Sequence, residues 1–409
     1  MTDLIDEIQD TQQANQPYDY LIIGGGIVGG YAAESIRELD KDGTIGIVST
    51  DMDEPYTRPA LSKLIWTSDT FTEKDVPFGT AEKTSAEIML ETEAIEIDRN
   101  RHTVQLSNGR TIGYIKLLIA TGSEPNKIQG PEDDHVIYFR SFEDYRKLRR
   151  FSGKQQHVIV VGGGYIGSEL AAALIQNNTR VTYLYPDNVL FEKKFPKELT
   201  EKLESTFRDA GVEMVNNSRV SSYRKEDDDT FVLTLESGKE IQGDTIVFGL
   251  GVTPRLSLAE KTGLTITDGV VVNNFLQTDD PDIYAAGDIV SYIDPIFGRK
   301  RIEHVDHARK SGAAVGKIMA GSKEPYNHTP YFYSHIFDIS WQALGTLDPE
   351  LDLLSDTVGD GKIFYYLKND KPIGALIWRA DVDLDDVRHV LDNPPTDSKE
   401  LKGLVKEKD

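Results

Sequence analysis

Three glycines, Gly24, Gly26 and Gly29, have the spacing Gly-x-Gly-x-x-Gly directly after the apolar run Tyr18–Ile23. Apolar residues at helical spacing follow them, so this part of the chain predicts a strand, a tight turn and a helix. In such a turn one glycine makes the bend, one lets a pyrophosphate approach the backbone, and one lets helix and strand pack closely. The helix N-terminus then presents free N–H groups and a positive dipole end to the phosphates. This pattern indicates the binding of a dinucleotide.

The same pattern returns about 140 residues later, where Gly162, Gly164 and Gly167 follow the apolar run His157–Val161. A single glycine pattern of this kind is weak evidence, because glycine-rich turns also occur in unrelated α/β folds. Two copies, each between a strand and a helix, predict two dinucleotide-binding folds in one chain.

An acidic side chain follows the second glycine cluster at the distance that bears on nucleotide choice. Asp187 lies 20 residues after Gly167. A carboxylate there accepts hydrogen bonds from the ribose hydroxyls of NADH and repels the 2′-phosphate of NADPH. We therefore expect NADH to be preferred, although the neighbouring Lys193 and Lys194 act against that preference.

Three further apolar runs end in small or acidic residues, where a chain passes close to a nucleotide or a neighbouring domain. They are Leu117–Gly122, Thr245–Gly251 and Ile283–Asp288. The residues at these ends are Ala120, Thr121, Gly122, Gly251, Gly287 and Asp288. The Asp288 carboxylate is able to accept hydrogen bonds from a sugar or ribitol hydroxyl, but an Ala-Gly-Asp segment on its own is most often just a turn.

Cysteine is absent from the 409 residues. Disulfides, thiolate metal sites and mechanisms with a sulfur nucleophile or a redox-active dithiol are therefore excluded. The length allows two or three domains, each with its own core, and the strand–turn–helix units predict an α/β fold.

The formal net charge is −23. A surface this acidic repels phosphate backbones, so we expect no nucleic-acid partner. It also repels an acidic protein unless a local basic patch intervenes. No run approaches the roughly 18 apolar residues that a membrane-spanning helix needs, and residues 1–17 lack the basic and apolar blocks of a signal peptide. We expect no membrane span and a cytoplasmic location.

Four motifs make the pattern more specific: Arg-Pro-Ala-Leu-Ser-Lys at 58–63, Gly-Tyr-Ile-Gly-Ser-Glu at 164–169, Ala-Gly-Asp at 286–288 and Arg-Ile-Glu-His-Val-Asp-His-Ala at 301–308. With them, nearly the whole chain after Tyr18 resembles the pyridine-nucleotide-dependent flavoprotein reductases with two dinucleotide folds. Within that group it is most similar to the family of apoptosis-inducing factor and its prokaryotic relatives, and next to the oxygenase-type ferredoxin reductases.

The resemblance implies an FAD-binding domain divided between residues 1–142 and 254–325. An NAD(H)-binding domain at 143–253 is inserted into it, and a small α+β domain follows at 326–409. Both larger domains are then Rossmann-like, the cofactors are FAD and NAD(H), and a homodimer is expected. Compared with apoptosis-inducing factor, the chain is short near residues 356–361, so we do not carry over apoptotic or DNA-binding roles.

The resemblance also implies roles for single residues. Arg58 and Lys63 lie beside the flavin ring, and Glu169 pairs with that lysine. A cation near the flavin N5 edge favours the electron-rich reduced ring, while the carboxylate keeps the lysine oriented. Asp288 holds the FAD ribitol. Tyr165 lies where the nicotinamide docks and acts as a gate, with simple packing at the helix start as the alternative.

Glu303 and His304 fall near flavin and nicotinamide at the start of a helix whose dipole supports the reduced ring, and Tyr333 matches an aromatic residue near the outer face of the flavin. A metal site is the alternative, because His304 and His307 would share one helix face; we expect none. The family has a glutamate in the first fold where this chain has Thr50. Either Asp51 reaches the adenosine ribose or FAD is held less tightly there.

Together, the motifs and the resemblance predict an FAD-dependent enzyme that takes hydride from NADH and passes electrons to an unidentified acceptor. The acceptor is a small molecule, a quinone, oxygen or a redox protein. The alternative is an NADH sensor that forms a long-lived charge-transfer complex between reduced FAD and NAD, turns over slowly and changes its oligomeric state or partner. The short C-terminal domain favours the enzyme.

Overall fold

The computed structural model describes residues 16–153, 156–226 and 230–408. It forms two compact units, each built from separated stretches of the chain. In the described residues the first unit comprises 16–57, 74–123 and 254–328, and the second comprises 58–73, 124–253 and 329–408. Most of the N-terminal segment that lacks signal-peptide features lies outside the described residues. The predicted bounds of the four domain segments stay predictions.

The centre of the first unit is a parallel sheet of buried, apolar strands. Strands of this kind are covered on both faces in α/β folds. In spatial order the strands are β3 (Glu87–Met89), β2 (Ile45–Val48), β1 (Tyr18–Ile23), β6 (Thr111–Ile119) and β18 (Ile283–Ala285).

Strand β6 is longer than the predicted run, which began at Leu117. Its first half pairs with β5 (Thr103–Leu106), which in turn pairs with β4 (Ala94–Asp98), both antiparallel. The second half lies between β1 and β18 in the parallel sheet. One strand therefore belongs both to the nucleotide fold and to an antiparallel extension.

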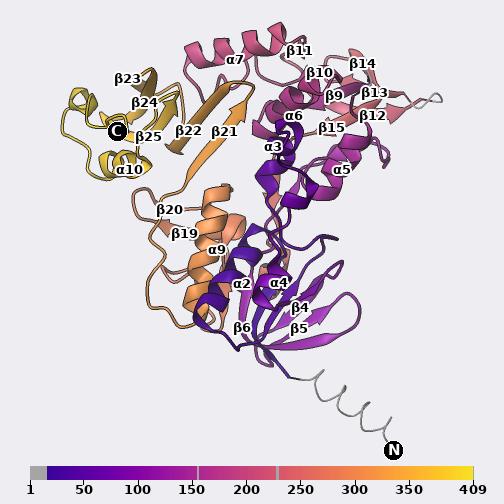
Figure 1. Cartoon of the computed structure of the whole chain (residues 1–409), viewed down its shortest axis with the longest axis vertical. Helices are drawn as coiled ribbons and strands as arrows, with labels where there is room; N and C mark the ends of the chain where they lie inside the picture. Colours follow the sequence, from indigo (N-terminus) through magenta and orange to yellow (C-terminus); the bar gives the residue numbers. More distant parts are fainter. Residues whose placement is uncertain (1–15, 154–155, 227–229, 409) are drawn as a thin grey trace, which may run out of the picture. The chain divides into compact units, whose positions relative to one another are not determined.

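Helices α2 (Ile27–Leu39) and α9 (Val305–Met319) pack side by side in the first unit, as Figure 1 shows. A Cβ added at Gly316 of α9 would meet the carbonyl oxygen of Ala32 at 2.4 Å. The two backbones approach closely because the contact residues are small. The unit also contains α4 (Thr80–Thr84), α8 (Ser257–Lys261), η3 (Gly287–Ile289), and the small sheet of β17 (Val270–Val271), β19 (Val290–Asp294) and β20 (Gly298–Lys300).

The second unit repeats the design with another five-stranded parallel sheet. Its strands in spatial order are β11 (Glu213–Val215), β10 (Arg180–Leu184), β9 (His157–Val161), β15 (Thr245–Phe248) and β8 (Val136–Tyr138). Helices α5 (Phe142–Arg150), α6 (Tyr165–Gln176) and α7 (Lys197–Asp209) accompany it, together with an antiparallel meander of β12 (Val220–Lys225), β13 (Phe231–Leu235) and β14 (Glu240–Gly243).

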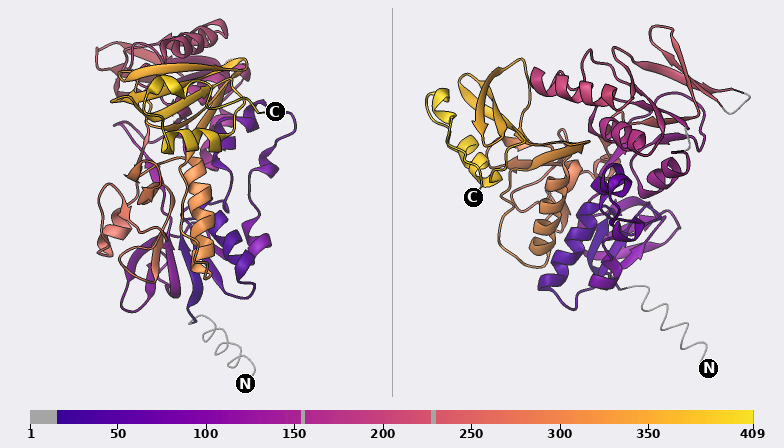
Figure 2. Two further views of the ribbon diagram at one scale, coloured as in Figure 1. Left: turned by 90° about the vertical axis from the view of Figure 1, so that its left-hand side faces the viewer. Right: turned by 45° about the horizontal axis from the view of Figure 1, so that its top comes forward.

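The C-terminal part of the second unit is an antiparallel sheet. Figure 2 shows helix α10 (Leu384–Asp392) at this sheet, where it contacts β25 (Lys371–Trp378). Residues 359 and 360 alone join β23 (Asp352–Val358) to β24 (Gly361–Lys368), so the predicted shortness of this region corresponds to a tight hairpin. The strands in spatial order are β21 (Tyr331–Ile336), β22 (Ile339–Gly345), β25 (Lys371–Trp378), β24 (Gly361–Lys368) and β23 (Asp352–Val358), and η4 (Ser398–Leu401) follows α10.

The remaining short elements are η1 (Arg58–Ser62) and α3 (Leu64–Thr67) in the second unit, and η2 (Glu73–Asp75), β7 (Ser123–Pro125) and β16 (Val252–Pro254) where the chain passes between units. The predicted fold class, with two Rossmann-like folds and an α+β C-terminal part, is confirmed. Within the described ranges, no helix is both long enough and apolar enough to cross a bilayer.

Candidate active site

The first glycine turn, between β1 and α2, is closely packed on two sides and open on the third. Gly24 has φ +124°, and a Cβ on it would meet the carbonyl oxygen of Ala120 at 2.1 Å. A Cβ on Gly29 would meet the carbonyl oxygen of Gly24 at 2.2 Å. At Gly26, the N-cap of α2, no described heavy atom lies within 4 Å of the added Cβ. The turn therefore leaves open space at a helix N-terminus, which suits a pyrophosphate.

The second turn, between β9 and α6, repeats this geometry. Gly162 has φ +125°, and its added Cβ would meet the carbonyl oxygen of Gly249 at 2.2 Å. For Gly167 the carbonyl oxygen of Gly162 lies at 2.0 Å. The N-cap Gly164 again has no described neighbour within 4 Å. The residues of both turns thus fit a dinucleotide.

Lys63 and Glu169 form the predicted ion pair in the second unit. Lys63 Nζ lies 2.7 Å from Glu169 Oε2, and the side chains are 14% and 2% exposed. Lys63 precedes α3, and Glu169 lies in the second turn of α6. The pair is confirmed, while its role beside the flavin stays a prediction.

Two serines that the sequence did not single out also bind the Glu169 carboxylate. Ser62 Oγ donates to Oε2 at 2.5 Å, and Ser334 Oγ donates to Oε1 at 2.5 Å. Both serines are buried. Ser62 could have been inferred from its place next to Lys63. Nothing in the spacing of Ser334, 165 residues from Glu169, indicated the contact.

Arg58 and Tyr333 lie in the same unit as this ion pair. The Arg58 guanidinium donates to the carbonyl oxygen of Arg140 at 2.7 Å. Tyr333 is 38% exposed, and the Lys63 ammonium lies 5.7 Å from its ring centroid. A partly exposed aromatic face therefore lies next to the lysine.

Tyr165, the predicted gate, begins α6 within an aromatic cluster. Its ring centroid lies 5.3 Å from that of Phe191 and 5.5 Å from that of Phe332. The buried hydroxyl has no hydrogen-bond partner among the described residues. Burial raises the pKa of Tyr165, so the phenol is neutral at physiological pH. A hydroxyl without a hydrogen bond is compatible with a side chain that moves.

Asp187 lies beyond the end of β10, and Lys193 Nζ contacts its Oδ1 at 2.6 Å. The aspartate side chain is 18% exposed and the lysine side chain 70%. Lys193, which was expected to weaken the preference for NADH, therefore forms an ion pair with Asp187, which was expected to favour NADH.

In the first fold, Thr50 is exposed and Asp51 is half-buried. The Asp51 carboxylate accepts hydrogen bonds from the Tyr56 hydroxyl at 2.9 Å and from the Asp53 amide at 3.3 Å. These bonds orient the carboxylate, and whether it reaches the adenosine ribose stays a prediction.

The strand-end residues lie in the segments that follow β6, β15 and β18, where Gly287 and Asp288 begin η3 and do not form the expected turn. Ser123 Oγ donates to Asp288 Oδ2 at 2.9 Å, and Gly287 has φ +78° against Val28 of α2. Asp288 therefore lies in the unit that contains the first glycine turn. The Ala120 amide donates to the carbonyl oxygen of Ile23. The Thr121 hydroxyl donates to the carbonyl oxygen of Arg255, whose amide donates to the carbonyl oxygen of Gly122. In the second unit, the carbonyl oxygen of Gly251 accepts from the Asn126 amide.

The start of α9 differs from the expectation at its histidines. His304 is the N-cap with φ −108° and ψ 143°, so it precedes the helix and does not share a helical face with His307. His307 is fully buried and bonds to the Tyr326 hydroxyl at 2.9 Å. Glu303 forms an ion pair with Arg301. Across the described ranges, no group of three or more His, Asp or Glu side chains forms a metal-binding arrangement.

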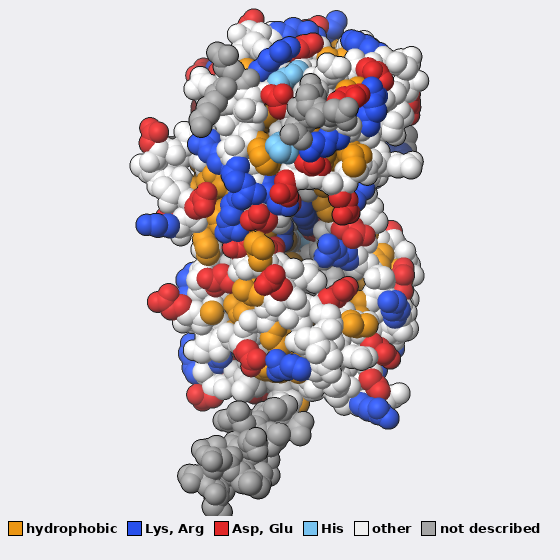
Figure 3. All heavy atoms as spheres, turned by 90° about the vertical axis from the view of Figure 1, so that its right-hand side faces the viewer, with side chains coloured by type: hydrophobic (Ala, Val, Ile, Leu, Met, Phe, Trp, Pro, Cys, Tyr) orange, Lys and Arg blue, Asp and Glu red, His pale blue; other side chains and the backbone are white. Residues whose placement is uncertain are grey.

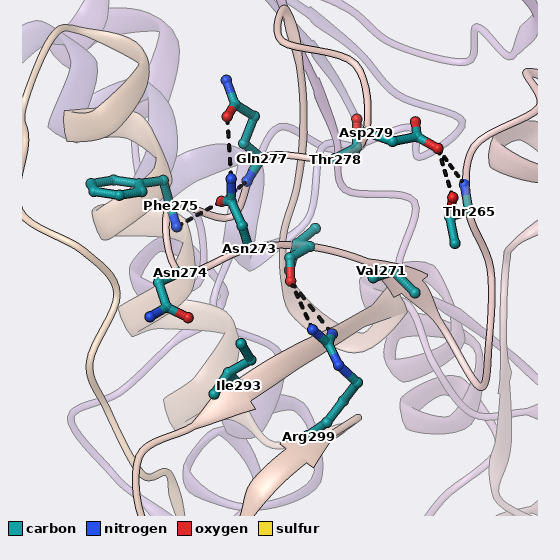
Figure 4. A pocket seen from close by; sticks show the side chains of 11 residues that line it. Thr265, Val271, Asn273, Asn274, Phe275, Gln277, Thr278, Asp279, Ile293 and Arg299 are labelled. Carbon is teal, nitrogen blue, oxygen red and sulfur yellow. Dashed lines mark hydrogen bonds between the residues drawn. The ribbon is translucent and has the colours of Figure 1, made fainter.

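A cavity of about 600 Å³ lies elsewhere in the first unit, near β17, β19 and β20 (Figure 4). Two of its charged side chains form hydrogen bonds within the wall. Arg299 donates to the backbone carbonyls of Val272 and Ser291, and Asp279 accepts from Thr265. None of the predicted site residues lines it.

Charge is mixed on the face of the molecule shown in Figure 3, where basic, acidic and hydrophobic side chains alternate. The net charge of −23 therefore does not make every part of the surface acidic. The expected homodimer and cytoplasmic location stay predictions.

Comparisons with known proteins agree with this geometry. The pyridine nucleotide-disulphide oxidoreductase family matches residues 18–312. Peroxisomal monodehydroascorbate reductase 4 of Arabidopsis thaliana is 32% identical over 389 residues, which cover 88% of this chain and 78% of that protein. Mitochondrial apoptosis-inducing factor 1 of Dictyostelium discoideum is 30% identical over 418 residues, which cover 91% and 77%.

Among solved structures, a chain of the covalent putidaredoxin reductase–putidaredoxin complex is similar, with a TM-score of 0.83 and 25% identity. The match covers 93% of this chain and 94% of that one. Because this chain has no cysteine, it cannot itself perform the disulphide chemistry in the family name. The chain belongs to the pyridine nucleotide-disulphide oxidoreductase family, as an FAD- and NAD(P)H-dependent flavoprotein enzyme that passes electrons to a redox partner.

Proposed function

We propose that this enzyme oxidises NADH and passes the electrons to a small organic radical of the monodehydroascorbate type. The observation that carries the proposal is the repeated turn, in which Gly26 and Gly164 each leave open space at a helix N-terminus. The first turn would hold FAD and the second would hold NADH. FAD held there would supply the redox chemistry that links NADH, a two-electron donor, to a one-electron acceptor.

The residues of the second fold select and admit NADH. Asp187 accepts hydrogen bonds from the adenosine ribose once Lys193 releases it, and its charge disfavours a 2′-phosphate. Tyr165 turns away from Phe191 and Phe332 as the nicotinamide enters. Because its hydroxyl has no hydrogen bond within the described part of the chain, the movement breaks none.

Lys63 would supply positive charge beside the flavin ring. Glu169 fixes the direction of the ammonium group through a contact of 2.7 Å. The ion pair is nearly dry, so its geometry is maintained without competition from water.

The similarity to monodehydroascorbate reductases and the side chains near Lys63 both support an organic radical as the electron acceptor. Several relatives at 30–32% identity are monodehydroascorbate reductases. The absence of cysteine leaves no dithiol relay in this chain. Tyr333, 38% exposed and next to Lys63, offers an aromatic face and a cation to a flat organic anion. One NADH and one proton then reduce two radical anions to two ascorbate monoanions.

The test begins with an anaerobic titration of the purified flavoprotein with NADH, and separately with NADPH, followed by visible absorption. We expect bleaching at micromolar NADH and at higher NADPH. The reduced protein is then mixed with monodehydroascorbate generated by ascorbate oxidase, with a ferredoxin, with a quinone, or with air. We expect the fastest reoxidation with the radical, at two radicals per NADH.

Other outcomes identify other functions. Fastest reoxidation by the ferredoxin would replace the radical with an iron–sulphur protein, the second candidate, which the similarity to the putidaredoxin reductase complex favours. A long-wavelength band that persists in air for many minutes would favour the sensor. A protein that binds no flavin, or that neither nucleotide bleaches, would contradict the proposal altogether.

A further inference from the structure

We propose that Ser334 is a positioning residue for this reaction: its hydroxyl fixes the Glu169 carboxylate and, through it, the Lys63 ammonium. The inference rests on the proposed function, because Lys63 matters only if it faces the flavin. With Ser334, the site includes β21, a strand of the C-terminal sheet. Residue 334 lies beyond the residues 18–312 that the family matches.

Three donors surround one buried carboxylate. Ser334 Oγ donates to Oε1 at 2.5 Å, whereas Ser62 Oγ at 2.5 Å and Lys63 Nζ at 2.7 Å share Oε2. Glu169 is 3% exposed, Ser62 2% and Ser334 1%. Burial of a carboxylate is costly unless hydrogen bonds satisfy its oxygens, so each donor has a defined task.

Three separate parts of the second unit supply these groups. Glu169 comes from α6, Ser62 from the end of η1 and Ser334 from β21. Helix α6 contacts both η1 and β21, and the contact with β21 can be followed in Figure 1. The carboxylate therefore links the loop that carries Lys63 to the C-terminal sheet.

The two serines are not equivalent. Among the residues that the structure describes, Ser334 is the only donor to Oε1, while Oε2 keeps Lys63 if Ser62 is lost. Removal of the Ser334 hydroxyl leaves Oε1 buried without a donor. The carboxylate then turns to share its remaining donors, and the ammonium group of Lys63 loses its fixed direction.

The first experiment compares Ser334→Ala and Ser62→Ala with the parent holoenzyme in anaerobic stopped-flow reduction by NADH. We expect the hydride-transfer rate to fall about tenfold in Ser334→Ala and about threefold in Ser62→Ala, while the Kd for NADH changes less than about twofold. The flavin midpoint potential is measured alongside. It should become more negative in Ser334→Ala, because a less localised cation stabilises the reduced ring less.

Two further variants separate positioning from packing. Ser334→Thr keeps the hydroxyl and should restore both rate and potential. The matched control Ser291→Ala removes another fully buried serine, one whose hydroxyl has no hydrogen-bond partner in the described ranges, and should leave both unchanged. Parent-like rate and potential in Ser334→Ala would overturn the proposal. Equal losses in Ser334→Ala and Ser334→Thr, each with a lower Tm, would also overturn it.

A double-mutant cycle tests whether Ser334 acts through Glu169. In the Glu169→Gln background, Ser334→Ala should slow hydride transfer no further; a second tenfold loss would contradict the proposal. The two proposals fail differently. If NADH does not bleach the parent, the proposed function fails. If NADH reduces the parent normally and the serine variants have the same rate and potential as the parent, only the role of Ser334 is refuted.

Discussion

The carboxylate of Glu169 shows how much of one site is set by hydrogen bonds rather than by charge. An ion pair that is 14% and 2% exposed loses most of its hydration, and the attraction between the two charges alone often does not compensate. The hydroxyls of Ser62 and Ser334 satisfy the carboxylate. Similarity of motifs predicted the pair. Ser334 had to be found in the structure, because its hydroxyl, 165 residues from Glu169, acquires this role only through its position in space.

His307 allows a prediction of pH dependence at the same scale. Burial lowers its pKa to about 4; its ring stacks on Tyr292 at 4.4 Å, and its Nε2 has no partner within the described ranges. The unfolded chain takes up this proton near the ordinary pKa of about 6.5. Stability from the neutral ring is therefore full above about pH 6.5 and is lost as the pH falls to about 4, with a total near 3 kcal/mol.

Denaturant unfolding at pH 7.0 and pH 4.5 checks this prediction. The parent should lose more free energy of unfolding between the two values than His307→Gln, which has no titrating ring. The comparison of slopes matters, because the substitution also changes the hydrogen bond to Tyr326. Equal losses in parent and variant would show that other groups cause the acid sensitivity.

At the scale of elements, the two strand–turn–helix units were the most predictable parts of the chain. The run His157–Val161 is a strand with the predicted bounds, since apolar composition and the glycines after it define both ends. β6 begins six residues before the predicted Leu117, because pairing with β5 extends it, and such partners are not visible in local sequence. The shared histidine face was wrong because α9 begins one residue after His304.

The glycine turns predict opposite results from neighbouring substitutions. Gly26→Ala and Gly164→Ala place a methyl group in open space at φ near −90°, so the apoprotein should keep its stability within about 1 kcal/mol. The methyl group takes the space of the pyrophosphate, so affinity should fall about tenfold or more, for FAD in the first variant and for NADH in the second. Fluorescence titration and thermal unfolding measure the two effects.

Gly29→Ala and Gly167→Ala are the matched comparisons. Their methyl groups would lie 2.2 Å and 2.0 Å from carbonyl oxygens of the same turns. We expect these variants to lose about 2 kcal/mol or more of folding stability, because the turn has to open. If Gly26→Ala destabilised the apoprotein as strongly as Gly29→Ala, the open side of the turn would not be a ligand site.

For the whole molecule, the net charge of −23 bears on the choice of acceptor. An acidic ferredoxin is repelled at low ionic strength, and salt screens that repulsion. We expect its reduction rate to rise at least about threefold between 10 and 150 mM salt, while the rate with a neutral quinone stays nearly constant. Stopped-flow reoxidation across a salt series measures both. A ferredoxin rate that falls with salt would instead reveal a basic docking patch.

The interleaving of the two units has a consequence for synthesis on the ribosome. All five strands of the second parallel sheet lie within the continuous stretch 124–253. The first sheet has β1, β2, β3 and β6 early but lacks β18 until residue 285 has emerged. The nascent chain can therefore complete the second nucleotide fold while the edge of β6 in the first is still uncovered. Of the two nucleotide folds, the one whose first strand is synthesised earlier is therefore completed later.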